Sequence, residues 1–383
     1  MTRSYVLTFV TLFALFAAGV TLYVSWSEKR EGRKAALERV ELASALASAA
    51  PDSDAGVLDL PASYLEAAPR LLPAVKEHSF FDLLEMQLAE GGALPAAKKL
   101  ARRPLTDRVY LALAYDGPSA MSFVTSGRLD AWNTTPEDAF AVAAANLAKK
   151  SSEPFLAPAP GLYRSPWQDD YDAARLALPD LLEKLQVKGD TVAMAPNRET
   201  LLVAGSNDDD ALVGMAELAE KALAEPRAMA AVALRLDHGG WSPFLPPASF
   251  RSYLRLKKLV VEGDTADYEA QKVVLEARNQ RDGAQVIVAP LVVAKDRVTG
   301  APVTYAAWVK GVEALLPRAD YVVLVDLGHR AGPVAAGPWE RVKEVAGDAM
   351  RPLGVYPERF DVNTFPAPAA LARIGNDAPF DPR

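Results

Sequence analysis

The residues of this 383-residue chain best suited to chemistry are two pairs of aspartate and histidine. Asp237 directly precedes His238, and Asp326 precedes His329 by three residues. A carboxylate beside an imidazole can orient the ring for work as a general base. At strand ends the same residue types also bond to the nearby backbone, which is the alternative here. These four residues are therefore the candidate catalytic groups.

The chain contains no motif for a metal ion, a nucleotide or a thiolate nucleophile. The chain has three histidines, His78, His238 and His329. They lack the i, i+4 spacing that places two metal ligands on one helix face. Cysteine, phosphate-cradling glycine loops and a G-x-S-x-G motif are all absent. The run 208–210, three aspartates, lacks the alternating ligands and the glycine of a calcium loop, and we expect it to cap a helix. The sequence thus predicts neither a metal site nor a cofactor.

Three further residues are candidates for binding. Asn197 and Arg198 lie in the turn of a predicted hairpin, where we expect the arginine to be an exposed planar donor that recognises a carboxylate of a partner. Trp241 follows two glycines that permit close approach of a ligand to the backbone. The alternatives are a solvated turn for Arg198 and core packing for Trp241.

The elements that position these residues are clearest between Gly189 and Glu225, GDTVAMAPNRETLLVAGSNDDDALVGMAELAEKALAE. Two apolar runs, Thr191–Ala195 and Thr200–Ala204, flank a turn and predict a β-hairpin. A helix should follow, with the aspartates in its first turn and Met215 on its inner face.

This stretch also resembles a known family. Together with DRVYLALAYDGPSAMSFVTSGRLDAW (Asp107–Trp132) and YDAARLALPDLLEKL (Tyr171–Leu185), it is similar to the DUF1444 (YtpQ-like) family of bacterial proteins over roughly residues 104–244. The match is one of ordered elements. The resemblance implies a fold and brings no established activity with it.

Other patterns complete the predicted middle of the chain. A threonine cap followed by Pro136 opens a helix. We also expect helices at Tyr64–Glu77, Phe80–Leu88 and Tyr171–Leu185, and strands at Val109–Tyr115, Met121–Thr125 and Val232–Leu236.

The carboxy-terminal part begins after the proline-rich joint Pro243–Pro247. Phe250–Asn279 has a helical pattern with a possible break at Gly263. We expect strands at Gln285–Val293, Ala306–Val309 and Tyr321–Val325, a helix at Trp339–Ala349, and an irregular tail after Phe365.

The amino terminus predicts a membrane anchor. Tyr5–Trp26 contains no charged residue and is long enough to span a bilayer as a helix. Arg3 precedes this run, whereas Lys29, Arg30, Arg33 and Lys34 follow it. The positive-inside rule then places the bulk of the chain in the cytoplasm, as a single-pass protein of the cell inner membrane. An anchor with an exported domain is the alternative.

These elements predict an α+β fold with five parts. They are an anchor and helical stalk (1–50), a linker with helical padding (51–103), a DUF1444-like domain (104–246), a smaller α/β domain (247–365) and an irregular tail (366–383). The first domain should have a mixed, largely antiparallel sheet with helices on one face.

Composition narrows the function classes. The chain is 50% hydrophobic and 24% charged, as in globular proteins, and its net charge of -7 argues against a nucleic-acid partner. The missing catalytic signature favours a non-catalytic binding or scaffold protein with a protein partner. The alternative is a membrane-linked hydrolase or transferase that uses the scattered Asp and His residues. The oligomeric state stays open.

Overall fold

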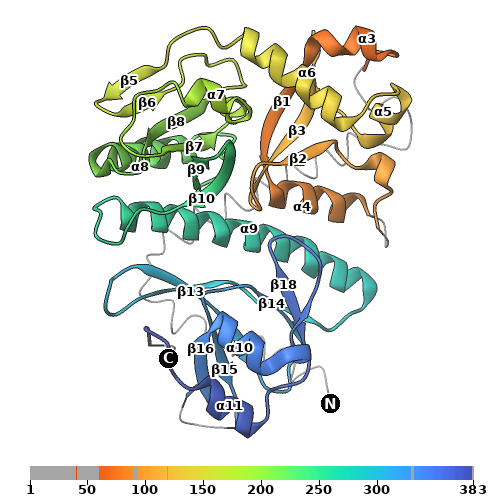
Figure 1. Cartoon of the computed structure of the whole chain (residues 1–383). Coiled ribbons are helices and arrows are strands. Elements are labelled where there is room, and N and C mark those ends of the chain that lie inside the picture. The colour runs from red at the N-terminus through yellow and green to blue at the C-terminus, as the bar shows by residue number, and fades with distance from the viewer. Residues whose placement is uncertain (1–39, 41–59, 90–92, 119, 329–331, 382–383) are drawn as a thin grey trace. The chain divides into compact units, whose positions relative to one another are not determined.

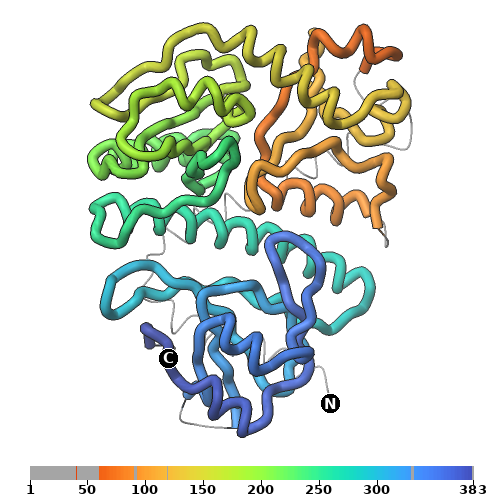
Figure 2. The backbone as a smooth tube through the Cα atoms, in the orientation of Figure 1, coloured from red at the N-terminus to blue at the C-terminus, as the bar shows by residue number. Residues whose placement is uncertain are grey.

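The computed structural model describes residue 40 and residues 60–89, 93–118, 120–328 and 332–381 (Figures 1 and 2). The predicted anchor Tyr5–Trp26 lies outside these residues, and of the predicted stalk only Val40 is described, within a helix. No helix in the described ranges is both long and apolar enough to cross a membrane. The chain divides into a first unit that ends at Asp264 and a second unit that begins at Thr265. The domain limits expected from the sequence stay a prediction.

The predicted α+β class is confirmed, because helices alternate with mainly antiparallel sheets. The first sheet of the first unit has the order β1-β3-β2, and β4 also pairs with β3. Its strands are β1 (Leu71–Glu77), β2 (Arg102–Pro104), β3 (Val109–Asp116) and β4 (Met121–Phe123). The strands predicted at Val109–Tyr115 and Met121–Thr125 are confirmed as β3 and β4, which pair antiparallel.

Strand β1 corrects a prediction. Tyr64–Glu77 was expected to be one helix, but only α3 (Tyr64–Ala67) and a 3-10 turn (Ala68–Arg70) are helical. Leu71–Glu77 instead pairs antiparallel with Val109–Tyr115 along its whole length. Its alanine, leucine and glutamate favour a helix locally, and the pairing overrides that preference.

Four helices accompany this sheet and the next. They are α4 (His78–Leu88), α5 (Ser126–Ala131), α6 (Pro136–Lys149) and α7 (Pro179–Leu182). The predicted cap of α6 is confirmed, since the Thr135 side chain accepts a hydrogen bond from the Asp138 amide. The single helix predicted at Tyr171–Leu185 is wrong. It is a 3-10 helix, η4 (Ala173–Ala177), followed by α7, because a proline disfavours helical geometry at Leu178 before it.

The second sheet of the first unit has six antiparallel strands in the order β10-β9-β7-β8-β6-β5. They are β5 (Leu156–Ala159), β6 (Leu162–Arg164), β7 (Thr191–Asn197), β8 (Thr200–Gly205), β9 (Ala233–Asp237) and β10 (Gly240–Phe244). The predicted hairpin β7–β8 is confirmed and lies at the centre of the sheet. Helix α8 (Asp209–Leu223) follows it, capped by Asp208, with Met215 fully buried as expected.

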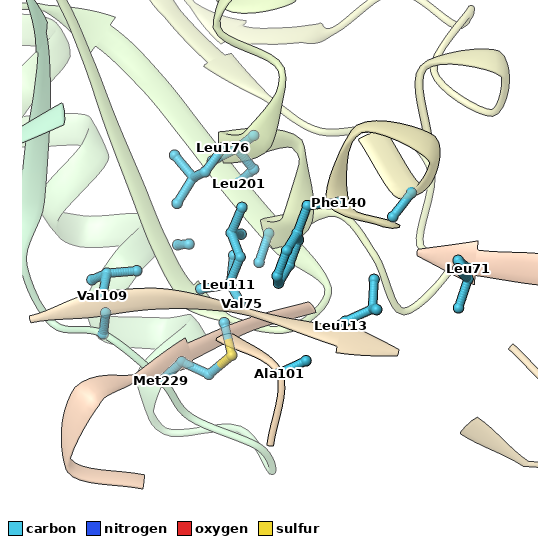
Figure 3. Close-up of a cluster of buried hydrophobic side chains, with 14 of the residues drawn as sticks. Leu71, Val75, Ala101, Val109, Leu111, Leu113, Phe140, Leu176, Leu201 and Met229 are labelled. Atoms are coloured by element: carbon cyan, nitrogen blue, oxygen red, sulfur yellow. The ribbon is translucent and has the colours of Figure 1, made fainter. Parts of the chain in front are cut away.

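Both sheets contribute to one core (Figure 3). Leu111 and Leu113 of β3 pack with Leu201 of β8, and Phe140 of α6 joins them. A second cluster buries α8 against the opposite face of the six-stranded sheet. The single sheet expected for this domain is therefore two sheets, each with its own helices.

Helix α9 (Tyr253–Asp282) runs without the break expected at Gly263. A Cβ at this glycine would lie 3.0 Å from the Cβ of Ala231. Gly263 thus serves a close packing contact inside the helix.

The second unit contains two four-stranded sheets. Their orders are β11-β14-β18-β17 and β12-β13-β15-β16, with parallel pairs at β11–β14 and β13–β15. The strands are β11 (Ile287–Val288), β12 (Val292–Lys295), β13 (Pro302–Val309), β14 (Ala314–Pro317), β15 (Tyr321–Val325), β16 (Ala335–Pro338), β17 (Arg351–Pro352) and β18 (Arg359–Val362).

Two predictions for this unit need correction. The strand expected at Gln285–Val293 is split between β11 and β12, which belong to different sheets. The tail contains helix α11 (Pro368–Ile374), whose Ile374 is buried in the core of the unit. The helix expected at Trp339–Ala349 is confirmed as α10 (Trp339–Ala346) with a 3-10 turn behind it.

Prolines occupy edge strands in all four described sheets. Proline has no backbone N–H, so it suits edges rather than central ladder positions. The residues are Pro73, Pro104, Pro158, Pro243, Pro338 and Pro352.

Candidate functional site

The most unusual titratable group of the first unit is Lys76, near the end of edge strand β1. Its ammonium lies 4.9 Å from the centre of the Phe80 ring and 5.8 Å from that of Phe123. Among the described residues no ion pair or hydrogen bond of this ammonium is found. Aromatic faces attract a cation, but they replace lost hydration only in part.

This environment lowers the pKa of Lys76 from 10.5 to about 8. Burial is the largest cause, because the charged form loses hydration. The positive charge of Arg198 lowers the pKa further, Glu77 opposes the shift, and Arg227 adds to it. At neutral pH the side chain is thus a cation with an appreciable neutral fraction.

Asp170 brings the two arginines together. Arg198 donates from Nε to Oδ1 of Asp170 at 3.0 Å, and its Nη2 lies 2.5 Å from Oδ2. Arg227 donates from Nη1 to the same Oδ1 at 3.0 Å. Burial alone would raise the pKa of Asp170, but the hydrogen bond and charge of Arg198, and the charge of Arg227, hold it below its usual value. We name Lys76, Asp170, Arg198 and Arg227 the Lys76 cluster.

A buried arginine supports the loop that carries Asp170. Arg175 is fully buried and binds both carboxylate oxygens of Asp169, at 2.7 and 2.9 Å. It also donates to Ser151 and stacks over the Trp167 ring at 3.9 Å. Planar, bidentate pairing fixes direction as well as distance. The residue directly before Asp170 is therefore held in place, which restricts where Asp170 can lie.

The backbone at this place adopts an uncommon conformation. Gln168, Asp170 and Arg227 have φ values of 49°, 67° and 64°. Non-glycine residues rarely enter the left-handed region, and such strain often accompanies functional sites. The left-handed conformation thus occurs both in the segment of Asp170 and in the segment of Arg227, which bind each other.

A small cavity of about 10 Å³ lies beside the cluster. Lys76, Asp170 and Arg198 line it, with Val75 and Met229 among the apolar residues. A single water needs roughly 10–15 Å³ measured in this way. The space therefore accepts one water-sized molecule, and any larger ligand must bind on the exposed side of the cluster.

The two residues predicted at the hairpin tip differ from their expected exposure. The Arg198 side chain is 25% exposed and paired with Asp170, so the prediction of an exposed donor is wrong. Asn197 is buried, and its amide donates to the Ala222 carbonyl and to Glu225. The tip docks on η4, where the Ala173 amide donates to the Arg198 carbonyl at 3.2 Å.

Trp241 is partly buried and packs against the core of the first unit. Its indole donates to the Leu176 carbonyl at 3.0 Å. The contact matches the packing alternative considered for this residue.

The catalytic candidates lie in separate units. Asp237 ends β9 and His238 begins the turn to β10; His238 Nε2 lies 3.3 Å from Asp237 Oδ1, and the His238 side chain is 97% exposed. Asp326 belongs to the second unit, where Lys310 donates to it at 2.7 Å. His329 lies outside the described residues. A catalytic role for these residues stays a prediction.

The aspartate run at 208–210 caps α8 as expected, since the Asp208 side chain accepts from the Ala211 amide. Asp209 has a further role that the sequence did not indicate, because it binds backbone amides of another segment. It accepts hydrogen bonds from the amides of Arg251 and Ser252 at 2.9 and 3.0 Å, which ties the start of α8 to the segment before α9. No group of residues suited to hold a metal ion is found in the described ranges.

Sequence reasoning did not identify Lys76 or Asp170. Lys76 falls in a segment whose pattern resembles a helix, and its aromatic neighbours come from other elements. The available signal was Asp169 and Asp170 next to each other ahead of an arginine, which marks a loop held by charge pairs. Comparison with family models, with curated proteins and with solved structures finds nothing that matches this chain.

Proposed function

We propose that this chain is a membrane-anchored binding protein, held by Tyr5–Trp26, whose cytoplasmic part recognises an acidic group on a protein partner. The contact is the exposed side of the Lys76 cluster. The anchor is supported by the uncharged apolar run and by the basic residues that follow it. The DUF1444 resemblance and the hydrolase or transferase alternative stay predictions beside this one.

The observation that carries the proposal is that two arginines from different segments share one carboxylate. Arg227 is 58% exposed, and a guanidinium has five N–H donors, of which Asp170 receives one from this residue. The Glu199 carboxylate lies 3.5 Å from the same nitrogen. The remaining donors of Arg227 are the ones that bind the partner. A guanidinium suits a carboxylate because the two planar groups form a bidentate pair of hydrogen bonds.

The test is capture of partners by the full-length chain, crosslinked in membranes and then solubilised. The variant Arg227→Ala removes the exposed donors and leaves the Arg198–Asp170 pair in place. We expect it to lose the partner while its melting temperature stays unchanged, because exposed ion pairs contribute about 0–1 kcal/mol.

The matched control is Arg251→Ala, since Arg251 is also exposed and also pairs with two aspartates of the same unit. This variant should capture the partner as the parent chain does. Equal capture by Arg227→Ala and the parent, or loss with both variants, contradicts the proposed contact.

A further inference from the structure

Lys76 combines three features that seldom occur together. Its ammonium has aromatic faces beside it, it has no anionic partner within the described part of the chain, and two arginines act on it with like charge. Burial and the two like charges disfavour the cation relative to the neutral amine, and the aromatic faces offset this only in part. The side chain is half-buried rather than sealed, so a small molecule from solvent can reach it.

The neutral amine is the nucleophilic form of lysine. With a pKa of about 8, about a tenth of the side chain is neutral at pH 7. An ordinary surface lysine near 10.5 has only about 0.03% in this form. At pH 7 a far larger fraction of Lys76 is thus in the nucleophilic form than of an ordinary surface lysine.

The cavity beside the cluster has room for about one water molecule, so an electrophile, CO2 included, must reach Lys76 from the exposed side of the cluster. Carbon dioxide is neutral, linear and three atoms long. It reacts with a neutral amine without a cofactor or an oxidant.

We propose that the ε-amine of Lys76 is a modification site that adds CO2 to form a carbamate. The lone pair of Nζ forms a bond to the carbon, one C=O π pair moves onto oxygen, and the nitrogen releases one proton to solvent. The balanced step is R-NH2 + CO2 → R-NH-COO⁻ + H⁺. The side chain changes from a cation at neutral pH to an anion.

The charges around Lys76 favour the product. Arg198 and Arg227 repel the ammonium, and the same two charges attract a carbamate at that place. The reaction therefore turns an unfavourable contact into a favourable one. The carbamate requires no protein partner, so the proposal stands independently of the partner contact.

The experiment uses the full-length chain in detergent, equilibrated with ¹³C-labelled bicarbonate and CO2 at pH 7.5 and examined by ¹³C NMR. We expect a carbamate resonance in the parent chain. It should disappear in Lys76→Arg, which keeps the positive charge but cannot form the adduct. It should also weaken in Arg227→Gln, which loses one stabilising charge.

A second measurement needs no variant. Alkylation of the carbamate with a trialkyloxonium reagent, followed by peptide mass spectrometry, locates the adduct. Lys188 serves as the internal control, because it is 75% exposed and its hydrogen bond to Asp208 raises its pKa. We expect trapping at Lys76 to exceed trapping at Lys188 several-fold. Absence of the resonance, its persistence in Lys76→Arg, or equal trapping at the two lysines overturns the proposal.

Discussion

Arg175 shows how one residue can hold the loop that carries Asp170. Its guanidinium bonds to Asp169, to Ser151 and to the Lys150 carbonyl while its side chain is fully buried. Removal of such a group leaves several polar partners unpaired at once, which is far more costly than the loss of a surface ion pair.

We therefore expect Arg175→Met to lower the free energy of unfolding by about 3 kcal/mol. Urea denaturation followed by tryptophan fluorescence measures the change. The exposed Arg281→Met is the control and should cost less than about 0.5 kcal/mol. Equal costs for the two variants would show that the network does not stabilise the loop.

The lowered pKa of Lys76 predicts how the free energy of unfolding changes with pH. Its pKa is lower in the folded chain, about 8, than its ordinary value of 10.5, so between these values the unfolded chain binds more protons. Stability must then rise with pH across this window, by at most about 1.4 kcal/mol per pH unit. Lys76→Met should lack the rise.

Urea midpoints measured from pH 7.5 to 9.5 test this expectation. The upper limit avoids Tyr171, whose pKa is raised by burial and by the charge and hydrogen bond of Asp116, and whose effect on stability has the opposite sign at higher pH. The same pH slope in Lys76→Met and in the parent chain would assign the effect to other groups.

At the scale of elements, the start of α8 joins two parts of the first unit. The amides of Arg251 and Ser252, and the hydroxyl of Ser252, all donate to the Asp209 carboxylate. Burial alone would raise the pKa of Asp209, but these bonds outweigh it and lower the pKa to about 2. The neighbouring Asp210 is 85% exposed.

We expect Asp209→Ala to cost about 1–3 kcal/mol, because it leaves two amides without an acceptor. Asp210→Ala should cost less than about 1 kcal/mol. Because the folded pKa of Asp209 lies below the ordinary 3.8, its contribution is complete above pH 4 and is lost as pH falls toward 2. Acid titration of the two variants by circular dichroism separates them. If Asp210→Ala proves as costly as Asp209→Ala, dipole and capping effects alone explain the run.

Local signals predicted the elements that depend on local chemistry. Thr135 with Pro136, and the apolar runs on both sides of the turn at Arg198, predicted α6 and the β7–β8 hairpin well. Leu71–Glu77 was missed because only its pairing with β3 makes it a strand. Arg198 was identified from its turn, but its exposure was not, because its partner Asp170 lies 28 residues away. Lys76 could not be recognised without Phe123 and the two arginines beside it.

At the scale of the whole molecule, orientation in the membrane is the property that the sequence predicts most directly. Lys29, Arg30, Arg33 and Lys34 follow the apolar run, and Arg3 precedes it. A reporter fused after Arg383 should therefore be active in the cytoplasm.

Replacement of those four basic residues by glutamine, with two lysines added before Tyr5, should move the reporter to the other side of the membrane. Paired cytoplasmic and export-dependent reporters measure both chains. Activity of the export-dependent reporter on the parent chain would contradict the orientation.

The prolines on the sheet edges affect how copies of this chain meet. Growth of a fibre by strand addition needs an uninterrupted row of donors and acceptors along an edge. Pro73, Pro158, Pro243 and Pro352 each remove a donor from such a row, in three of the described sheets. A second copy that aligns with one of these edges therefore finds a template with a donor missing at the proline, which disfavours strand addition at that edge.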